Sequence, residues 1–161
     1  MNYTDNSESL SRYEDFSRVY DHGTSCANRQ LVLYVLDRVS FREKKYPEGI
    51  SKEGRHMPSS LKRAGRETNR VGISVSRKVG NSVTRHHLCR LVRESYRLHD
   101  QEFERGLDLV VIVRPGAREC TFSEFERALL HLSKKAGIVR KDSGGQRKPE
   151  EREVPEKESR E

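Results

Sequence analysis

Long apolar segments are absent from this 161-residue sequence. No run approaches the roughly 18 consecutive apolar residues that a membrane-spanning helix needs. The first ten residues, MNYTDNSESL, contain no basic stretch and no apolar stretch, so they do not have the pattern of a secretory signal. We therefore expect a cytoplasmic protein that has no membrane partner.

Cysteine is also scarce, and its spacing excludes two common kinds of small domain. Cys26, Cys89 and Cys120 are odd in number and widely separated, and no CxxC pair occurs. Disulfide frameworks and structural zinc sites both rely on paired cysteines. We predict three reduced thiols and no metal ion held by the protein.

Apolar residues make up only 32% of the chain, whereas charged residues make up 35%. This composition predicts one domain with a modest core and terminal tails. From residue 140 onward, seven basic and seven acidic residues occur with almost no apolar ones. Because such segments bury too little apolar surface to fold, we predict a folded domain over 10–139, a disordered N-terminus (1–9) and a disordered charged tail (140–161).

Acidic residues are nearly missing from residues 70–99. This stretch contains seven Lys or Arg residues and a single acid, Glu94, so it carries +6, whereas the whole chain carries +7. Charge this concentrated is the electrostatic footprint of a protein that binds polyphosphate, most simply nucleic acid.

Hydrophobic periodicity and capping signals predict an α+β fold. Ser11 and Glu14 have the spacing of a capping box at the first helix, and Thr121 and Glu124 have it at the last. The predicted elements in chain order are a helix (11–21), a strand (30–36), an insertion (40–69), a strand (70–76), a helix (82–99), a strand (107–115) and a helix (121–136). This order, α-β-(insertion)-β-α-β-α, fits one small α/β sandwich with helices packed on a central mixed sheet.

The insertion over 40–69 has no clear hydrophobic period. Its basic residues outnumber its acidic residues by eight to four, and it contains Pro47, Pro58, Gly49, Gly54 and Gly65. Connections of this length are unusual inside a compact domain. We therefore predict a flexible basic insertion.

The helix over 82–99 separates into two faces when successive residues are placed 100° apart. The face predicted to be basic and exposed contains Arg85, His86, Cys89, Arg90, Arg93 and Arg97. The face predicted to pack on the core contains His87, Leu88, Leu91, Val92, Ser95 and Leu98. A row of arginines often belongs to a merely solvated face, but this row lacks the acidic partners that such faces usually carry.

The loop before this helix strengthens the prediction of a nucleic-acid site. It adds Arg77, Lys78 and the Gly80-Asn81 pair, and a helix N-terminus offers free N–H groups to phosphate. Arginine side chains match phosphate geometry with two parallel hydrogen bonds. The exposed face has almost no Asn or Gln to read bases. The pattern therefore favours recognition of a nucleic-acid backbone, with a weak preference for RNA.

Three aromatic residues form a second candidate site. Phe16 and Tyr20 lie four residues apart on the first predicted helix, and Tyr34 lies on the first predicted strand. Packing in the core is the simpler interpretation. The functional alternative is a stacking surface for a single strand, where each stacked base contributes about 1–3 kcal/mol.

The adjacent histidines His86 and His87 do not predict a metal site or catalysis. Neighbouring helical residues point about 100° apart, so they cannot chelate one ion together. His86 continues the basic face, and His87 is predicted to lie at the edge of the core. We expect no catalytic side chain on this protein.

The segment SVSRKVGNSVTRHHLCRLVRE (74–94) resembles the signature of the protein subunit of bacterial ribonuclease P. The matching positions are Lys78, Gly80, Asn81, Val83, Arg85, Arg90, Arg93 and Glu94. The segments over 16–36 and 108–117 are similar to the first helix and strand and to the C-terminal part of that family. This chain has His86-His87 after Arg85 where the family has Asn-Arg, and Cys89 where the family has Lys.

The resemblance implies a fold and a role. The fold is an α/β sandwich with a left-handed βαβ crossover, like domain 2 of ribosomal protein S5. The role is to bind a catalytic RNA, one protein per RNA, and the 5′ leader of precursor tRNA. The RNA then removes the leader with Mg²⁺ that it mainly holds itself, and no organic cofactor is implied. By the same resemblance, the catalytic RNA would be bound by Arg77, Lys78, Asn81, Arg85, His86, Arg90 and Arg93. The leader would be bound by Phe16, Tyr20 and Tyr34.

Three other classes of function share some of these features. A ribosomal protein or RNA chaperone would have the basic helix without aromatic residues that converge on a cleft. A DNA-binding regulator would keep duplex DNA against competing structured RNA. A nuclease that acts alone would need clustered carboxylates for metal ions, and the acids here are scattered.

Overall fold

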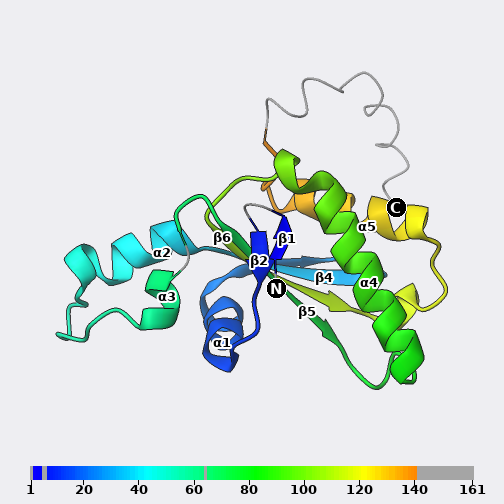
Figure 1. The fold of residues 1–161 in the computed structure, drawn as a ribbon, viewed down its shortest axis with the longest axis horizontal. Helices are drawn as coiled ribbons and strands as arrows, with labels where there is room; N and C mark the ends of the chain where they lie inside the picture. The colour runs from blue at the N-terminus through cyan, green and yellow to red at the C-terminus, as the bar shows by residue number, and fades with distance from the viewer. Residues whose placement is uncertain (1, 5–6, 64, 141–161) are drawn as a thin grey trace.

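The computed structural model describes residues 2–4, 7–63 and 65–140. A mixed six-stranded sheet has the order β1-β2-β5-β6-β4-β3 and carries helices on its faces (Figure 1). The strands are β1 (Asn2–Thr4), β2 (Ser7–Ser9), β3 (Thr24–Ala27), β4 (Leu31–Asp37), β5 (Asn69–Val75) and β6 (Leu107–Val113). The helices are α1 (Tyr13–His22), α2 (Arg38–Lys45), α3 (Ser59–Arg63), α4 (Ser82–His99) and α5 (Phe122–Lys135). Short 3-10 turns are η1 (Pro47–Gly49), η2 (Asp100–Glu102) and η3 (Pro115–Ala117).

The central strands run in both directions. β5 pairs parallel with β6, and α4 connects the two, which makes a βαβ unit. β4 pairs antiparallel with β6 on its other side. The start of β5, the start of β6 and the end of β4 therefore lie at the same end of the sheet.

Each face of the sheet has its own apolar layer. The larger layer joins alternate residues of β4 and β6, such as Leu33 and Val111, to Leu88 of α4 and Leu129 of α5. The smaller layer on the other face contains Leu10, Val19, Leu36 and Val110, with Phe16 and Tyr34 packed against it. The predicted sandwich of helices on a mixed sheet is confirmed.

The prediction of a disordered N-terminus is wrong for residues 2–4 and 7–9. β2 pairs parallel with β5, and the side chain of Ser7 is only 2% exposed. The Ser7 hydroxyl donates to Asp100 Oδ1 at 2.6 Å and lies 2.8 Å from the Tyr96 hydroxyl. This strand is held by hydrogen bonds to distant residues, so its own composition gave no signal.

The two predicted capping boxes had different outcomes. Thr121 and Glu124 form the predicted box at the start of α5, with bonds of 3.0 and 3.2 Å. The box at Ser11 is wrong, because α1 begins one residue later than the box requires and its N-cap is Arg12, which makes no side-chain cap.

Residues 40–69, which the sequence predicts to be a flexible insertion, contain regular structure. This part of the chain contains α2, η1 and α3, and we call residues 38–68 the arm. Asp37 caps α2 by accepting from the Ser40 N–H at 3.1 Å, and Leu61 is fully buried. In Figure 1 the arm extends to the left of the sheet. The predicted disordered tail lies outside the described residues, apart from residue 140.

Candidate nucleic-acid interface

The helix α4 spans the predicted residues, Ser82–His99. Asn81 fixes its start, because the side-chain oxygen accepts from the Thr84 N–H at 3.0 Å. Leu88 and Val92 are fully buried against the sheet. The cap and the apolar stripe together set which side chains of α4 face water.

The division of α4 into two faces is confirmed in outline, but its orientation differs from the prediction. Tyr96 is 2% exposed and stacks on Phe103 with a ring separation of 5.2 Å. Because the large Tyr96 ring enters the core, the buried face of α4 lies closer to the side of the helix that carries Arg85 than the prediction placed it. His87 and Leu98, both predicted to face the core, are exposed instead.

The remaining predicted residues form one cationic surface. Arg77, Lys78, Asn81, His86 and Arg90 are exposed, and Arg85 and Arg93 are half-buried. We call these seven residues the basic face. It extends from the loop after β5 onto the first half of α4.

The two half-buried arginines of the basic face differ in how their Nε atoms are satisfied. Arg85 Nε donates to the Gly80 carbonyl at 3.1 Å, so this side chain folds back over the loop. Arg93 Nε is buried and has no hydrogen-bond partner within the described part of the chain. Cys89 lies near both guanidinium groups, which oppose the rise in thiol pKa that burial causes. The terminal nitrogens of these arginines remain the groups available to an incoming phosphate.

Arg70 does not belong to this surface, although the sequence places it in the same basic stretch. It is 4% exposed, and its guanidinium makes two bonds to Asp108, of 2.9 and 2.8 Å. Without Arg70, six basic residues and Glu94 leave a charge of +5 over residues 77–97.

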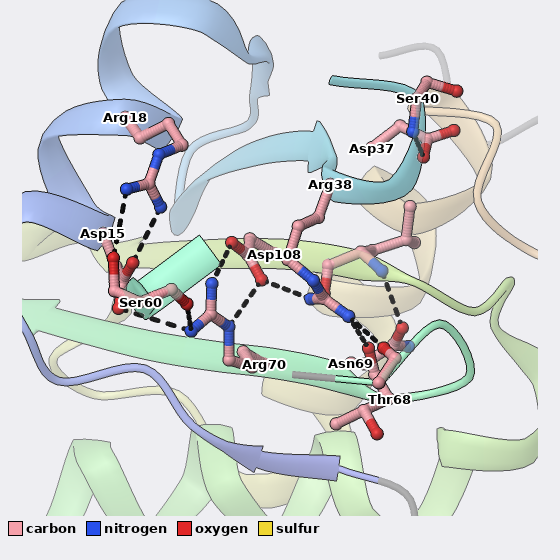
Figure 2. Close-up of polar contacts among 12 residues, drawn as sticks. Asp15, Arg18, Asp37, Arg38, Ser40, Ser60, Thr68, Asn69, Arg70 and Asp108 are labelled. Atoms are coloured by element: carbon pink, nitrogen blue, oxygen red, sulfur yellow. Dashed lines mark hydrogen bonds and ion pairs between the residues drawn. The ribbon is translucent and has the colours of Figure 1, made fainter. Parts of the chain in front are cut away.

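Arg70 is part of a buried charge network that the sequence analysis missed (Figure 2). Arg38 is fully buried and donates to Asp108 Oδ1 at 2.6 Å and to the carbonyls of Gly65 and Thr68 at 2.7 and 2.6 Å. Burial lowers the pKa of the Arg38 guanidinium, and Asp108 opposes that shift. The available signal was an aspartate inside the apolar strand β6.

The same network reaches α1 and α3. Arg70 donates to the Ser60 carbonyl at 3.1 Å and lies 3.4 Å from Asp15 Oδ2. Asp15 also binds Arg18 at 2.8 Å, and Arg18 donates to the Ser60 hydroxyl at 3.2 Å. These contacts fix the arm and α1 against the sheet.

The three predicted aromatic residues come together on the opposite face of the sheet from α4. The ring centroids of Phe16 and Tyr20 are 6.3 Å apart, and Tyr20 meets Tyr34 edge-on at 4.9 Å. Tyr20 is 40% exposed, whereas Phe16 and Tyr34 are half-buried. Burial, followed by the neighbouring Tyr34, raises the pKa of the Tyr20 hydroxyl. We call these three residues the aromatic cluster.

Gly72 of β5 allows this cluster to lie close to the sheet. A Cβ atom at Gly72 would lie 2.6 Å from Phe16 Cζ, so only glycine lets the ring approach this closely. Ser74, the next β5 residue on this face, is also small. Phe16 is thus held against the sheet, while Tyr20 is exposed to water and Tyr34 is partly exposed.

No helix among the described residues is long and apolar enough to cross a membrane. Within the same residues, no group of three His, Cys, Asp or Glu side chains is arranged to hold a metal ion.

Together, the basic face and the aromatic cluster can bind phosphates on one side of the sheet and offer aromatic rings on the other. A small α+β protein with these two surfaces is the class that the fold and the site define.

The comparison with protein families identifies this class more closely. The family model for ribonuclease P matches residues 5–137. The chain belongs to the ribonuclease P protein family.

Relatives and solved structures agree with this membership. The ribonuclease P protein component of Lachnoclostridium phytofermentans is 40% identical over 133 residues, which cover 83% of this chain and 92% of that protein. The corresponding protein of Alkaliphilus metalliredigens is 35% identical over 130 residues, 81% of this chain and 94% of that one. The Staphylococcus aureus RNase P protein structure matches with a TM-score of 0.60 at 28% identity, over 85% of this chain and all of that chain. The Thermotoga maritima protein, solved with 1-(4-fluorophenyl)-2-thiourea, matches with a TM-score of 0.58 at 26% identity, over 78% and 97% of the two chains.

Proposed function

We propose that this protein is the subunit that supports RNA- and Mg²⁺-dependent removal of the 5′ leader from precursor tRNA. It binds the catalytic RNA through the basic face and the leader through the aromatic cluster. The observation that carries the proposal is the convergence of Phe16, Tyr20 and Tyr34 on the sheet face opposite α4. A structural RNA-binding module would need the basic face alone.

The basic face suits the backbone of a folded RNA. Each cationic side chain that neutralises a phosphate releases counterions, which gives affinity without reading sequence. Arg90 is exposed, and Arg85 is fixed against the Gly80 carbonyl, so their guanidinium groups can form bidentate phosphate contacts. His86 adds another exposed donor where the family has asparagine.

The aromatic cluster suits a single strand whose sequence varies. Stacking on an aromatic ring contributes about 1–3 kcal/mol per base and tolerates every base. A leader that stacks on Tyr20 and Tyr34 would be bound in the precursor and absent from the product. The protein therefore tightens precursor binding relative to mature tRNA.

The chemistry itself belongs to the RNA in this proposal. Because the described residues contain no carboxylate or histidine cluster for a metal ion, we assign no side chain to Mg²⁺ and none to phosphodiester hydrolysis. The protein, one per RNA, neutralises phosphates where RNA and substrate meet. This lowers the Mg²⁺ concentration that the RNA needs.

The test is precursor-tRNA cleavage by the ribonuclease P RNA of the source organism at low Mg²⁺, with and without this protein. We expect strong stimulation that requires the RNA. Cleavage by the protein alone would instead support a nuclease. No stimulation, together with tight binding to another RNA or to duplex DNA in the presence of competing RNA, would support a structural module or a DNA-binding regulator.

A further inference from the structure

The arm carries the second concentration of positive charge on this protein. After Arg38, its basic residues outnumber its acidic residues by eight to four, a net charge of +4. Residues 77–97 carry +5, and the whole chain carries +7. All other residues together are therefore slightly acidic, which means that the net positive charge lies in these two regions.

Most of the described basic side chains of the arm are directed to water. Those that are exposed are Lys44, Lys45, Lys52, Arg55, Lys62 and Arg66. Apart from the buried pair of Arg38 with Asp108, the described residues of the arm form one ion pair, Arg66 with Glu43 at 3.1 Å, and both of its side chains are largely exposed. Among the described side chains of the arm, six exposed basic residues therefore outnumber four exposed acidic ones, of which Glu53 lies near Lys45 and Arg55.

The arm is also held rigidly. Arg38 binds the carbonyls of Gly65 and Thr68, and Arg70 binds the carbonyl of Ser60. Burying two guanidinium groups requires strong compensation, and here that compensation fixes the arm to the sheet. The exposed charges of α2 and α3 therefore have defined positions relative to the basic face.

The arm and the basic face lie at opposite ends of the central strands. β5 begins directly after the arm and ends directly before the loop that contains Arg77 and Lys78. A strand of its length spans about 20 Å. In Figure 1 the arm is at the left, and α4 begins at the lower right. A short run of phosphates cannot reach both surfaces. The arm would therefore contact a different stretch of RNA backbone from the one that the basic face contacts.

The helix α1 separates the arm from the aromatic cluster. Arg18 follows Phe16 by two residues, and His22 follows Tyr20 by two residues. Each arm-facing residue therefore lies about 200° around the helix from its aromatic partner. Arg18 and His22 contact the arm, the latter through Phe41 at a ring separation of 5.0 Å.

A leader that passed from the aromatic cluster to the arm around α1 would cross the outer surface of that helix. That surface carries Glu14 and Asp21, which are both exposed. Their carboxylates repel phosphate, so the geometry favours the folded catalytic RNA over the leader as the partner of the arm.

We propose that the arm is a second phosphate-binding surface for the catalytic RNA, separate from the basic face. The proposal rests on the proposed function. Lys44 and Lys45 are two of its exposed contacts. They supply cationic contacts in a chain whose α4 has His87 and Cys89 where the family signature has basic residues.

The test compares the double variant Lys44→Ala/Lys45→Ala with a matched control, Arg127→Ala/Lys135→Ala. The control also removes two exposed positive charges, but from α5 on the other face of the sheet. The full-length proteins are titrated against the catalytic RNA alone at several salt concentrations. We expect the arm variant to lose about tenfold in affinity at low salt and its salt slope to fall by about two, because each phosphate contact contributes about 0.9. We expect the control to bind like the wild type.

Three results would overturn this proposal. The first is unchanged binding of the arm variant to the catalytic RNA. The second is an equal loss in the control, which would indicate an effect of total charge. The third is a loss that appears only when the reconstituted enzyme binds precursor with a leader, which would assign the arm to the leader. Failure of the proposed function looks different, because variants of the basic face would then also leave catalytic-RNA binding unchanged.

Discussion

Arg70 and Arg90 belong to the same basic stretch of sequence, but their surroundings differ completely. Arg70 is 4% exposed and is neutralised by Asp108 and Asp15. Arg90 is exposed and has no hydrogen bond or ion pair within the described part of the chain. The sequence could not separate these two arginines, because Asp108 lies 38 residues beyond Arg70.

Replacing Arg90 with alanine should weaken binding of the catalytic RNA with little effect on folding. Loss of one phosphate contact should reduce the slope of log K against log salt by about 0.9. An exposed side chain without fixed partners should change the free energy of unfolding by less than about 0.5 kcal/mol. Filter binding across a salt series and urea unfolding measure the two quantities.

The matched control for this variant is Arg127→Ala, which removes an exposed arginine from α5. A wild-type salt slope in the Arg90 variant would mean that Arg90 does not contact phosphate.

At the scale of elements, α4 depends on its cap as well as on its arginines. Asn81 is expected both to cap α4 and to lie beside a phosphate, and substitutions can separate the two roles. Asn81→Asp keeps a good N-cap and places a negative charge at the positive end of the helix, which preserves stability. The same charge repels phosphate and should reduce RNA affinity several-fold.

Two comparisons make this prediction specific. Asn81→Ser should preserve both the melting temperature and RNA binding more nearly, whereas Asn81→Ala should lose about 1 kcal/mol of stability. Thermal melts and RNA titrations of the three variants measure both effects. Undiminished RNA binding by Asn81→Asp would show that no phosphate lies near this cap.

Elements with a strong local signal could be predicted from the sequence. α4 and β6 have clear apolar patterns, and the capping box of α5 satisfies its own backbone. β2 and the arm could not be predicted in the same way, since their order depends on partners such as Asp100 and Asp108, which lie far away in the chain. The residues of the basic face could be listed from the sequence, because the charge of a side chain does not depend on the fold. Their exposure on α4 could not, because it depends on how Tyr96 packs.

At the scale of the whole molecule, Asp108 connects the arm to the sheet. It accepts from both Arg38 and Arg70 and is fully buried. Asp108→Ala removes the carboxylate that Arg38 binds and leaves Arg70 with Asp15 alone, which should cost about 3–5 kcal/mol of unfolding free energy. Urea denaturation measures this loss, and limited proteolysis should show earlier cleavage within the arm.

The control for Asp108 is Glu43→Gln, which breaks an exposed ion pair in the arm itself. Exposed pairs contribute about 0–1 kcal/mol, so this variant should keep nearly wild-type stability and resistance to protease. Comparable stability of the two variants would show that the buried network does not hold the arm.

The spacing of the network also has a consequence for synthesis on the ribosome. Asp108 is made 70 residues after Arg38, which takes about 4–14 s at typical elongation rates. During that interval Arg38 lacks the carboxylate that it binds in the core, so the arm cannot adopt its final position. A chain that is truncated before β6 leaves Arg38 without its carboxylate and the sheet without a central strand. Proteases should therefore cleave such a chain faster than the full-length protein.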